Sequence, residues 1–200
     1  MKPKIANSWR FLLRFIVFFA LAYIIWDFTA PLGAKILGGV AGVLVKAVDN
    51  HDFIIDVKGA GKNIVVVQQK AKDIQPLSLE YKGFTFNTVL LVALIMAVPD
   101  LKYKLRAKIL FLGIIILFPV QVFRLFVFII NYYKNIKMTG TDYIFTGFMR
   151  NTFGYIDKVL IRIDGQILPV VVWAALLYYY KWYNTLAKLK KKKTLPVAAQ

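Results

Sequence analysis

The chain has 200 residues, of which 59% are hydrophobic and only 18% charged, and its mean hydropathy is +0.60. A soluble domain is about half apolar and a quarter charged, so this composition excludes intrinsic disorder and indicates apolar surface beyond that of a small core. Lys and Arg outnumber Asp and Glu by 27 to 10, which gives a net charge of +17. In a soluble protein such an excess would indicate nucleic-acid binding, so the position of the charge along the chain decides the class.

The first apolar segment, residues 11–28, is interrupted by Arg14 and closed by Asp27. It follows basic residues, as a signal peptide does, but no small-residue cleavage site comes after it. We therefore interpret it as a retained first membrane span, with a signal peptide as the alternative.

Three further apolar segments complete the expected set of spans. Residues 83–99 are uncharged but short, whereas residues 109–133 carry one charge over 25 residues, enough to cross about 30 Å of hydrocarbon. Residues 167–180 are uncharged and lead into a cluster of Tyr and Trp that is typical of a membrane–water boundary. The sequence predicts a mainly α, polytopic membrane protein with about four transmembrane helices, and residues 1–200 form a single integral membrane domain.

The basic residues predict the orientation of these spans. With the N-terminus inside, the inner segments hold 14 basic residues and one acid, whereas the outer segments hold 12 basic residues and nine acids. Because cytoplasmic loops are enriched in Lys and Arg, both termini are expected to be cytoplasmic. The basic tail, residues 184–200, includes the lysine-rich run 188–193. Directly after a span, such a run serves as a topology anchor or contacts anionic headgroups, so the lipid bilayer, and not nucleic acid, is the expected partner.

Residues 31–82 form the first expected extracytoplasmic segment, an amphipathic helix followed by a β-hairpin. Within residues 31–48, apolar side chains recur at helical spacing, which is typical of an interfacial helix lying along the outer leaflet. The alternative is that small residues spaced four apart form a smooth strip for close contact with another helix. The apolar face consists of Leu32, Ile36, Val40, Val43, Leu44 and Ala47, and the small-residue strip consists of Ala34, Gly38 and Gly42.

The hairpin is indicated by the alternation of residues 52–58, in which Phe53, Ile55 and Val57 share one face. Residues 59–61, Gly-Ala-Gly, are expected to turn the chain. Because an isolated hairpin is only marginally stable, we expect this element to pack on the membrane surface or on a partner. The return strand is expected at residues 64–69, and a third alternating segment follows at residues 77–82.

The second expected extracytoplasmic loop, residues 134–166, mixes charged and aromatic side chains. Its residues 139–142, Thr-Gly-Thr-Asp, have the composition of a turn and are expected to lead into a short helix.

Arg124 is the most informative residue because it is the single charge within the 109–133 segment. A charge at membrane depth costs at least about 2.5 kcal/mol at the centre and is usually kept for a partner or a pathway. Gln121 shares its helical face, and Asn131 lies two turns further on. Arg124 either grips a carboxylate or a phosphate, or it snorkels to the outer headgroups or pairs with an outer acid such as Asp142. We take Arg124, Gln121 and Asn131 as candidate intramembrane polar or partner-binding residues.

Residues that commonly carry catalysis or hold cofactors are scarce in this chain. Cysteine is absent, and the single histidine, His51, lies beside Asp49 and Asp52. Neighbouring residues on a strand point to opposite sides, which favours a surface turn over a metal site at His51. No Ser or Thr is paired with an evident base, and residues 59–61 lack the strand-to-helix context of a phosphate-binding loop. The sequence therefore predicts no catalytic residue, no cofactor and no metal.

Residues 76–135 carry a recognisable order of elements. Leu-Ser-Leu-Glu-Tyr-Lys-Gly-Phe at 77–84 precedes a short span that ends in Ala-Val-Pro at 97–99, and a basic loop then leads to Phe-Pro-Val-Gln-Val-Phe-Arg at 118–124. This block resembles the exosortase/archaeosortase membrane proteins, which cleave and transfer surface proteins that bear a C-terminal sorting segment. The resemblance implies a catalytic cysteine near the outer end of one span, an arginine in the next span and a histidine in a later span, with Arg124 in the arginine position.

Two members of that catalytic set are missing from the sequence. The cysteine position falls near residues 83–88, where this chain has Phe-Thr-Phe-Asn at 84–87, and residues 143–169 contain no histidine. The chain is similar instead to the exosortase H-associated membrane proteins, a small accessory group that lacks the set. The resemblance implies a non-catalytic accessory protein of the bacterial cytoplasmic (inner) membrane, with a sorting transpeptidase as its membrane protein partner.

Two alternative functions stay open at this point. The first is a degenerate transpeptidase or protease that uses Arg124 with Thr85 or Thr88, although no base is evident to activate the hydroxyl. The second is a small transporter or lipid-handling component, for which one intramembrane charge and the lack of internal repeats give little support.

Overall fold

The computed structural model describes residues 4–49, 52–69, 77–99, 101–139, 142–164 and 167–193. Within these ranges the chain is mainly helical (76%), with five helices and two small antiparallel sheets, which confirms the expected mainly α class with a small β element. The helices are α1 (Lys4–Lys46), α2 (Tyr81–Ala97), α3 (Tyr103–Tyr133), α4 (Gly147–Asp164) and α5 (Ile167–Lys193). The strands are β1 (Ile54–Ala60), β2 (Asn63–Gln68), β3 (Leu77–Glu80), β4 (Lys137–Thr139) and β5 (Asp142–Tyr143).

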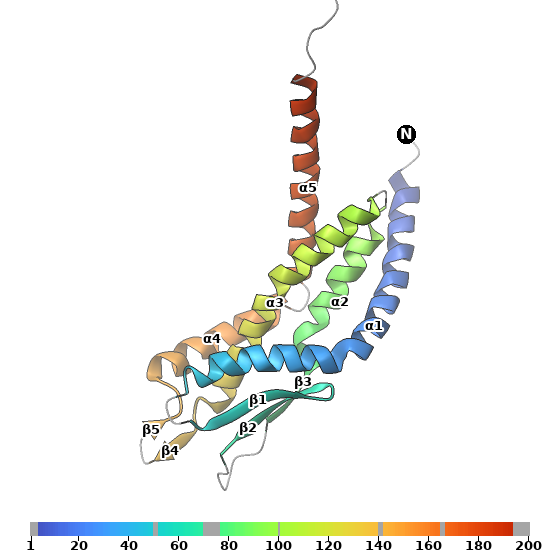
Figure 1. The fold of residues 1–200 in the computed structure, drawn as a ribbon. Coiled ribbons are helices and arrows are strands. Elements are labelled where there is room, and N and C mark those ends of the chain that lie inside the picture. The colour runs from blue at the N-terminus through green and yellow to red at the C-terminus, as the bar shows by residue number, and fades with distance from the viewer. Residues whose placement is uncertain are drawn as a thin grey trace, which may run out of the picture.

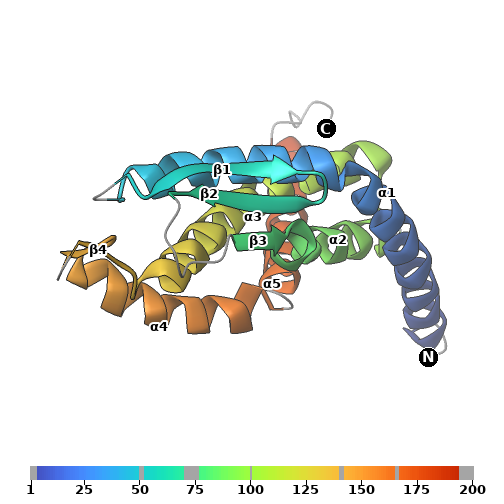
Figure 2. The same cartoon turned by 90° about the horizontal axis from the view of Figure 1, so that it is seen from below.

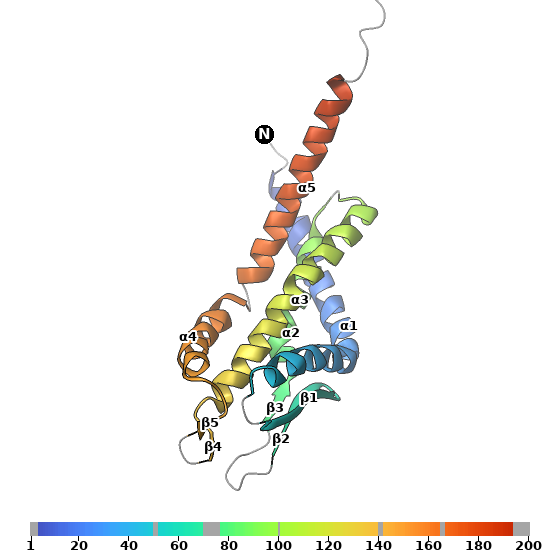
Figure 3. The ribbon, with the colours of Figure 1, turned by 60° about the vertical axis from the view of Figure 1, so that its left-hand side comes forward.

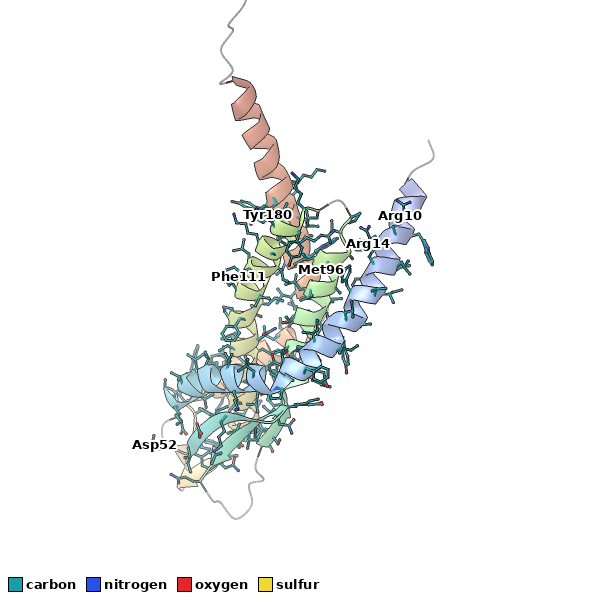
Figure 4. The ribbon with its side chains drawn as sticks, turned by 45° about the vertical axis from the view of Figure 1, so that its right-hand side comes forward. Arg10, Arg14, Asp52, Met96, Phe111 and Tyr180 are labelled. Carbon is teal, nitrogen blue, oxygen red and sulfur yellow. The ribbon has the colours of Figure 1, made fainter. Side chains whose placement is uncertain are left out.

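The first half of α1 runs alongside α2, α3 and α5 to form the helical body of the molecule (Figure 1). The beginning of α1 and the end of α5 lie at the same end of this body. Figure 4 shows Arg10 and Arg14 at this end, together with Met96 and Tyr180, and Asp52 at the opposite end beside the sheet. The segments expected on the two sides of the membrane therefore lie at opposite ends of the helical body.

Two of the described helices are long and apolar enough to cross a membrane. They are α1, from Trp9 to Lys46, and α3. The 17 residues of α2 and the apolar part of α5, Ile167–Lys181, are shorter than the roughly 20 residues that a spanning helix needs. The membrane-spanning character expected for residues 11–28 and 109–133 is thus consistent with helix length, whereas the count of four spans is not established by length alone.

The helix expected at residues 31–48 is not a separate element, because it continues the first span within α1. The ribbon of α1 changes direction in its middle and then crosses the lower end of the helical body (Figures 1 and 3). Pro31 lies inside the helix, where a proline lacks the backbone N–H and its ring meets the carbonyl one turn earlier. This local loss of hydrogen bonding explains why one helix contains both the span and the segment that crosses it.

The second half of α1 presents an apolar exposed face and a buried face of small residues. Leu32, Ile36 and Val43 of the expected apolar set are exposed, whereas Ala34 and Ala41 are completely buried. The exposed apolar side chains agree with the expected interfacial helix, since such a helix directs this face into the outer leaflet.

The strip of small residues does make a close contact, but with strand β1 and not with another helix. A Cβ added to Gly38 would lie 3.2 Å from the carbonyl carbon of Lys58, and one added to Gly42 would lie 3.1 Å from the Cβ of Val57. The strip therefore packs closely, as the alternative interpretation predicted, but its partner is a strand and not another helix.

The sheet has the strand order β1-β2-β3 with both pairs antiparallel, so the third expected strand is confirmed over Leu77–Glu80. The sheet packs on the second half of α1 (Figure 3). The sequence did not anticipate this contact with the chain's own helix, and the expectation that the hairpin packs on the membrane surface or on a partner stays a prediction.

Two details of the hairpin differ from the sequence pattern. The register shifts between Ile54 and Asp56, and this bulge turns Ile55 outward with an exposed fraction of 51%, so Ile55 does not share a face with Phe53 and Val57. Gly59 belongs to β1 and not to the turn, which begins at Gly61 (φ +59°).

The close approach of α1 to β1 explains why residue 59 is a glycine. A Cβ added there would lie 2.6 Å from the carbonyl carbon of Ala34, so glycine is required for packing and not for the turn.

The second outer segment contains more regular structure than the expected turn and short helix. Strands β4 and β5 pair antiparallel, with Thr139 opposite Asp142, and residues 140–141 between them lie outside the described ranges. The helix that follows, α4, has 18 residues. Seen from below, α4 and the second half of α1 lie on opposite sides of the lower end of the helical body (Figure 2).

Candidate functional site between helices α1, α2 and α3

A buried polar contact joins α3 to the first turns of α2. The Nε2 of Gln121 donates to Asn87 Oδ1 (2.6 Å) and to Thr88 Oγ1 (2.8 Å), and both Gln121 and Asn87 are buried. Three polar side chains in a largely apolar body are tolerated because they satisfy one another. Gln121 was singled out by sequence, whereas its partners on α2 were not.

A second polar contact joins α1 to α2 next to the first. The indole N–H of Trp26 donates to Thr85 Oγ1 (3.2 Å), and the Thr85 hydroxyl donates to the Tyr81 carbonyl one turn earlier (3.1 Å). Thr85 is buried, so its hydroxyl is held as an acceptor for one helix and a donor to its own helix.

Arg124 lies over an aromatic ring of α2. Its guanidinium carbon is 5.2 Å from the centroid of the Phe84 ring, a distance typical of a cation–π contact. The same Phe84 ring packs edge-to-face on Phe128, with centroids 5.6 Å apart. Gln121, Arg124 and Phe128 therefore use one face of α3 to contact α2, as their spacing predicts. The suggested pairing of Arg124 with Asp142 involves a side chain outside the described part of the chain.

Asn131 contacts α4 and is separate from the other two candidate residues. Its Nδ2 donates to Asp157 Oδ2 (2.8 Å), and Asp157 is only 5% exposed. The remaining oxygens, Asn131 Oδ1 and Asp157 Oδ1, are buried and have no hydrogen-bond partner among the residues that the structure describes. The structure thus brings Gln121 and Arg124 together on α2 and places Asn131 at a different junction.

A shallow groove of about 170 Å³ lies between α1 and α2 beside this polar cluster. Its wall is mostly apolar, but Trp26, Thr29 and Thr88 contribute polar atoms, and two of these residues belong to the contacts described above. The remaining lining residues are Ala22, Ile25, Val89 and Val92. The groove is therefore a mostly apolar surface formed by two helices of the body, with Thr29 and Thr88 among its lining residues.

Comparison with protein families identifies the chain over most of its length. The family model for exosortase H-associated membrane proteins matches residues 5–178. The chain belongs to the exosortase H-associated membrane protein family. This confirms the resemblance seen in residues 76–135 and extends it to the second half of α1, the sheet and α4. Comparison with curated proteins and with solved structures gave no match.

In this exosortase H-associated membrane protein, an ion-pair cluster that sequence reasoning missed lies shortly before the bend of α1. The carboxylate of Asp27 lies 2.6 Å from the Nζ of Lys62 in the hairpin turn and 2.7 Å from the Nζ of Lys82 in α2. Lys82 also lies over the rings of Tyr23 and Trp26. The sequence did contain a signal for this cluster, because Asp27 is an acid at the end of an apolar segment. Such a charge needs partners from the outer segments.

Two further features of the sequence are His51 and the lysine-rich run. His51 lies outside the described residues, and within the described ranges no three His, Cys, Asp or Glu residues come close enough to hold a metal ion. The backbone of α5 is helical to Lys193, beyond the expected end of the span at residue 180.

Proposed function

We propose that this chain is a non-catalytic accessory component of an exosortase-type protein-sorting system in the bacterial cytoplasmic membrane. The observation that carries the proposal is the match of residues 5–178 to the exosortase H-associated family, whose name implies association with such a system. The partner is a membrane protein of that system, and the bilayer is the surrounding medium.

The proposed arrangement has four membrane crossings with both termini in the cytoplasm. The directions of α2 and α5 beside α1 and α3 support four crossings, since all four segments follow the same body (Figure 1). The position of Arg10 and Arg14 at the end opposite the sheet supports the orientation (Figure 4), because basic residues favour the cytoplasmic side. A short α2 is compatible with crossing where neighbouring helices and local thinning accommodate the mismatch.

The contacts of the candidate nucleophiles support a non-catalytic role. The Thr85 hydroxyl proton is donated to the Tyr81 carbonyl, and Thr88 accepts from the amide of Gln121. A nucleophilic hydroxyl instead needs a neighbouring base that takes its proton. Phe84 lies under Arg124, in the stretch where the resembled enzymes are expected to have cysteine, so the arginine is engaged by an aromatic ring.

The groove between α1 and α2 is the proposed contact for a helix of the partner. Without a hydrophobic driving force inside the bilayer, helices associate through close packing and polar contacts. Thr29 and Thr88 line this mostly apolar groove, and their hydroxyls, which already bond within the chain, can each take part in one further hydrogen bond with a partner side chain.

Co-purification tests the proposed association directly. The full-length chain, solubilised in mild detergent from cells that contain its exosortase, is expected to elute together with that exosortase, and deletion of the chain is expected to impair sorting of the surface proteins. A chain that elutes alone, with sorting intact in the deletion strain, would contradict the proposal. A catalytically active purified chain with Arg124→Ala inactive but folded would instead favour the degenerate-enzyme alternative.

A further inference from the structure

A cationic pocket lies where the end of α3 meets α4, away from the cluster between α1, α2 and α3, and this end of the body is the outer side in the orientation of the proposed function, on which this inference rests. It has a volume of about 570 Å³ and lies between the end of α3 and one side of α4. Three of its lining residues are cations that come from both elements. The lining consists of Lys134, Arg150, Asn151, Gly154, Tyr155 and Lys158.

Within the part of the chain whose side chains the structure describes, the three cations of this pocket have no neighbouring acid that neutralises them. Among the side chains that the structure describes, no carboxylate lies within 4 Å of Lys134, Arg150 or Lys158. The nearest described acid that belongs to this junction is Asp157, which accepts a hydrogen bond from Asn131. Among the described side chains, three cations face one carboxylate, and the resulting positive potential favours an anionic ligand.

Aromatic rings and one glycine set the shape of the pocket. The guanidinium of Arg150 lies 3.6 Å from the centroid of Tyr143, a stacking arrangement that leaves the edge of its planar fork able to donate. Lys158 lies over the ring of Tyr155 at 6.0 Å. A Cβ added to Gly154 would lie 3.0 Å from the Nζ of Lys134, so the Lys134 ammonium lies directly against α4 at this glycine.

The helix that carries the pocket has an exposed apolar stripe next to it. On a wheel of 100° per residue, Met149, Phe153 and Leu160 form the side that packs on the core. The cations occupy the next sector, and the apolar stripe follows beyond them. This stripe consists of the exposed residues Phe148, Tyr155, Val159 and Ile163.

The pocket lies at the end of α3, a helix long enough to cross a membrane, and this position indicates the headgroup region. Lys134 directly follows the last residue of α3, and α4 ends just before α5 begins. Figure 3 shows α4 beside the lower end of α3 and below the start of α5. A helix at this depth, with an apolar stripe and adjacent cations, has the pattern of an interfacial element on anionic lipid.

We propose that the Lys134–Arg150–Lys158 pocket binds the phosphate of an anionic phospholipid headgroup in the outer leaflet. The acyl chains of that lipid run along the apolar stripe of α4, and the headgroup phosphate accepts hydrogen bonds from the fork of Arg150 and from the two ammonium groups. This site is independent of the proposed partner contact, since it lies on other elements and requires no other protein.

Native mass spectrometry of the full-length, delipidated protein tests the site. Phosphatidylglycerol and phosphatidylcholine with identical acyl chains are offered at equal concentration, and the chain is expected to retain phosphatidylglycerol. The double variant Arg150→Gln, Lys158→Gln is expected to lower that retention about tenfold or more, since each basic residue near an anionic surface contributes a severalfold preference. Both side chains reach the surface, so the variant is expected to elute as the unmodified chain does.

The matched control removes two cations elsewhere on the outer side. Lys35 and Lys58 are exposed and lie outside the pocket, so Lys35→Gln with Lys58→Gln is expected to leave retention of phosphatidylglycerol unchanged. Equal retention of the two lipids by the unmodified chain, or equal losses in the two double variants, would overturn the proposal. Displacement of the lipid by an equal concentration of inorganic phosphate would assign the pocket to a free anion and would also overturn it.

Discussion

At the scale of single residues, Gln121 is the polar side chain that most clearly ties two helices of the body together. Its position one turn before Arg124 made it a candidate from the sequence, because both residues share a face of one helix. The sequence could not supply the partners, since Asn87 and Thr88 lie on α2 and only the packing of α2 against α3 brings them within 2.6–2.8 Å.

Replacing Gln121 with leucine removes both hydrogen bonds while nearly preserving side-chain size. We expect Gln121→Leu to lower the free energy of unfolding by about 1–2 kcal/mol, since Asn87 and Thr88 lose a partner in a poorly hydrated environment. Thermal or denaturant unfolding in detergent micelles measures the change. Ile114→Leu on the exposed side of α3 is the control. Equal stability of the two variants would show that the contact of Gln121 with Asn87 and Thr88 does not stabilise the fold.

Arg124 and Asn131 show the same limit of residue-scale reasoning. Helical spacing placed them on one side of α3, but it could not reveal what covers each turn of that side. The structure covers Arg124 with Phe84 of α2 and joins Asn131 to Asp157 of α4. A lone arginine in an apolar span is recognisable from sequence, whereas its neighbours depend on how helices distant in the chain pack.

At the scale of elements, the contact between α1 and β1 depends on glycine. The strip Ala34, Gly38 and Gly42 was recognisable by its spacing, but its partner was not, because a smooth surface accepts a helix or a strand equally well. The bulge at Ile55 was likewise invisible, since the alternating pattern of residues 52–58 is that of a regular strand. Close approach and register are properties of the packed pair, and neither is encoded in one segment alone.

Two glycine-to-alanine variants separate packing from helix propensity. Gly59→Ala places a methyl group against the backbone of α1 and is expected to lower the free energy of unfolding by about 1–3 kcal/mol. Gly39→Ala lies in the same contact region of the chain but has open space around it, so we expect a gain of about 0.5–1 kcal/mol from higher helix propensity. Unfolding in micelles measures both, and a stabilising Gly59→Ala would contradict the close packing of β1 on α1.

The bend of α1 predicts a distance that electron paramagnetic resonance measures. Because the chain has no cysteine, spin labels attach only at Leu13→Cys and Val43→Cys, two exposed positions in the two halves of α1. A straight helix would separate them by about 45 Å at 1.5 Å per residue, and the bent helix predicts a clearly shorter distance. The pair Leu13→Cys and Phe28→Cys, both in the first half, is the control, with about 22 Å expected.

A distribution centred on the straight-helix distance would show that α1 does not bend. The ion pairs at Asp27 supply a second test of the same element, since they join the end of the first half to Lys62 and Lys82. Asp27→Asn is expected to broaden the distribution for the longer pair and to leave the control pair unchanged.

At the scale of the whole molecule, the most apolar part of α1 is covered by the rest of the chain much less than that of α3. Only 11% of the most apolar window of α1 is buried within the chain, against 50% for α3. Hydropathy and charge were sufficient to predict a membrane protein of mainly α class, and the order of elements in residues 76–135 was sufficient to indicate the family. The exposed side of α1 and its groove with α2 could not be predicted from the sequence, because both depend on how α1 packs against the neighbouring helices.

The proposed docking of a partner helix in that groove makes one direct prediction for cross-linking. Ile25 lines the groove and is 63% exposed, whereas Phe111 is 65% exposed on α3 and lies outside the groove. Single-cysteine variants at these two positions carry a photo-activated cross-linker in cells that contain the exosortase. Ile25→Cys is predicted to give an adduct that contains the exosortase, and Phe111→Cys is predicted to give none. No exosortase adduct from Ile25→Cys, or equal adducts from both positions, would contradict the proposed role of the groove.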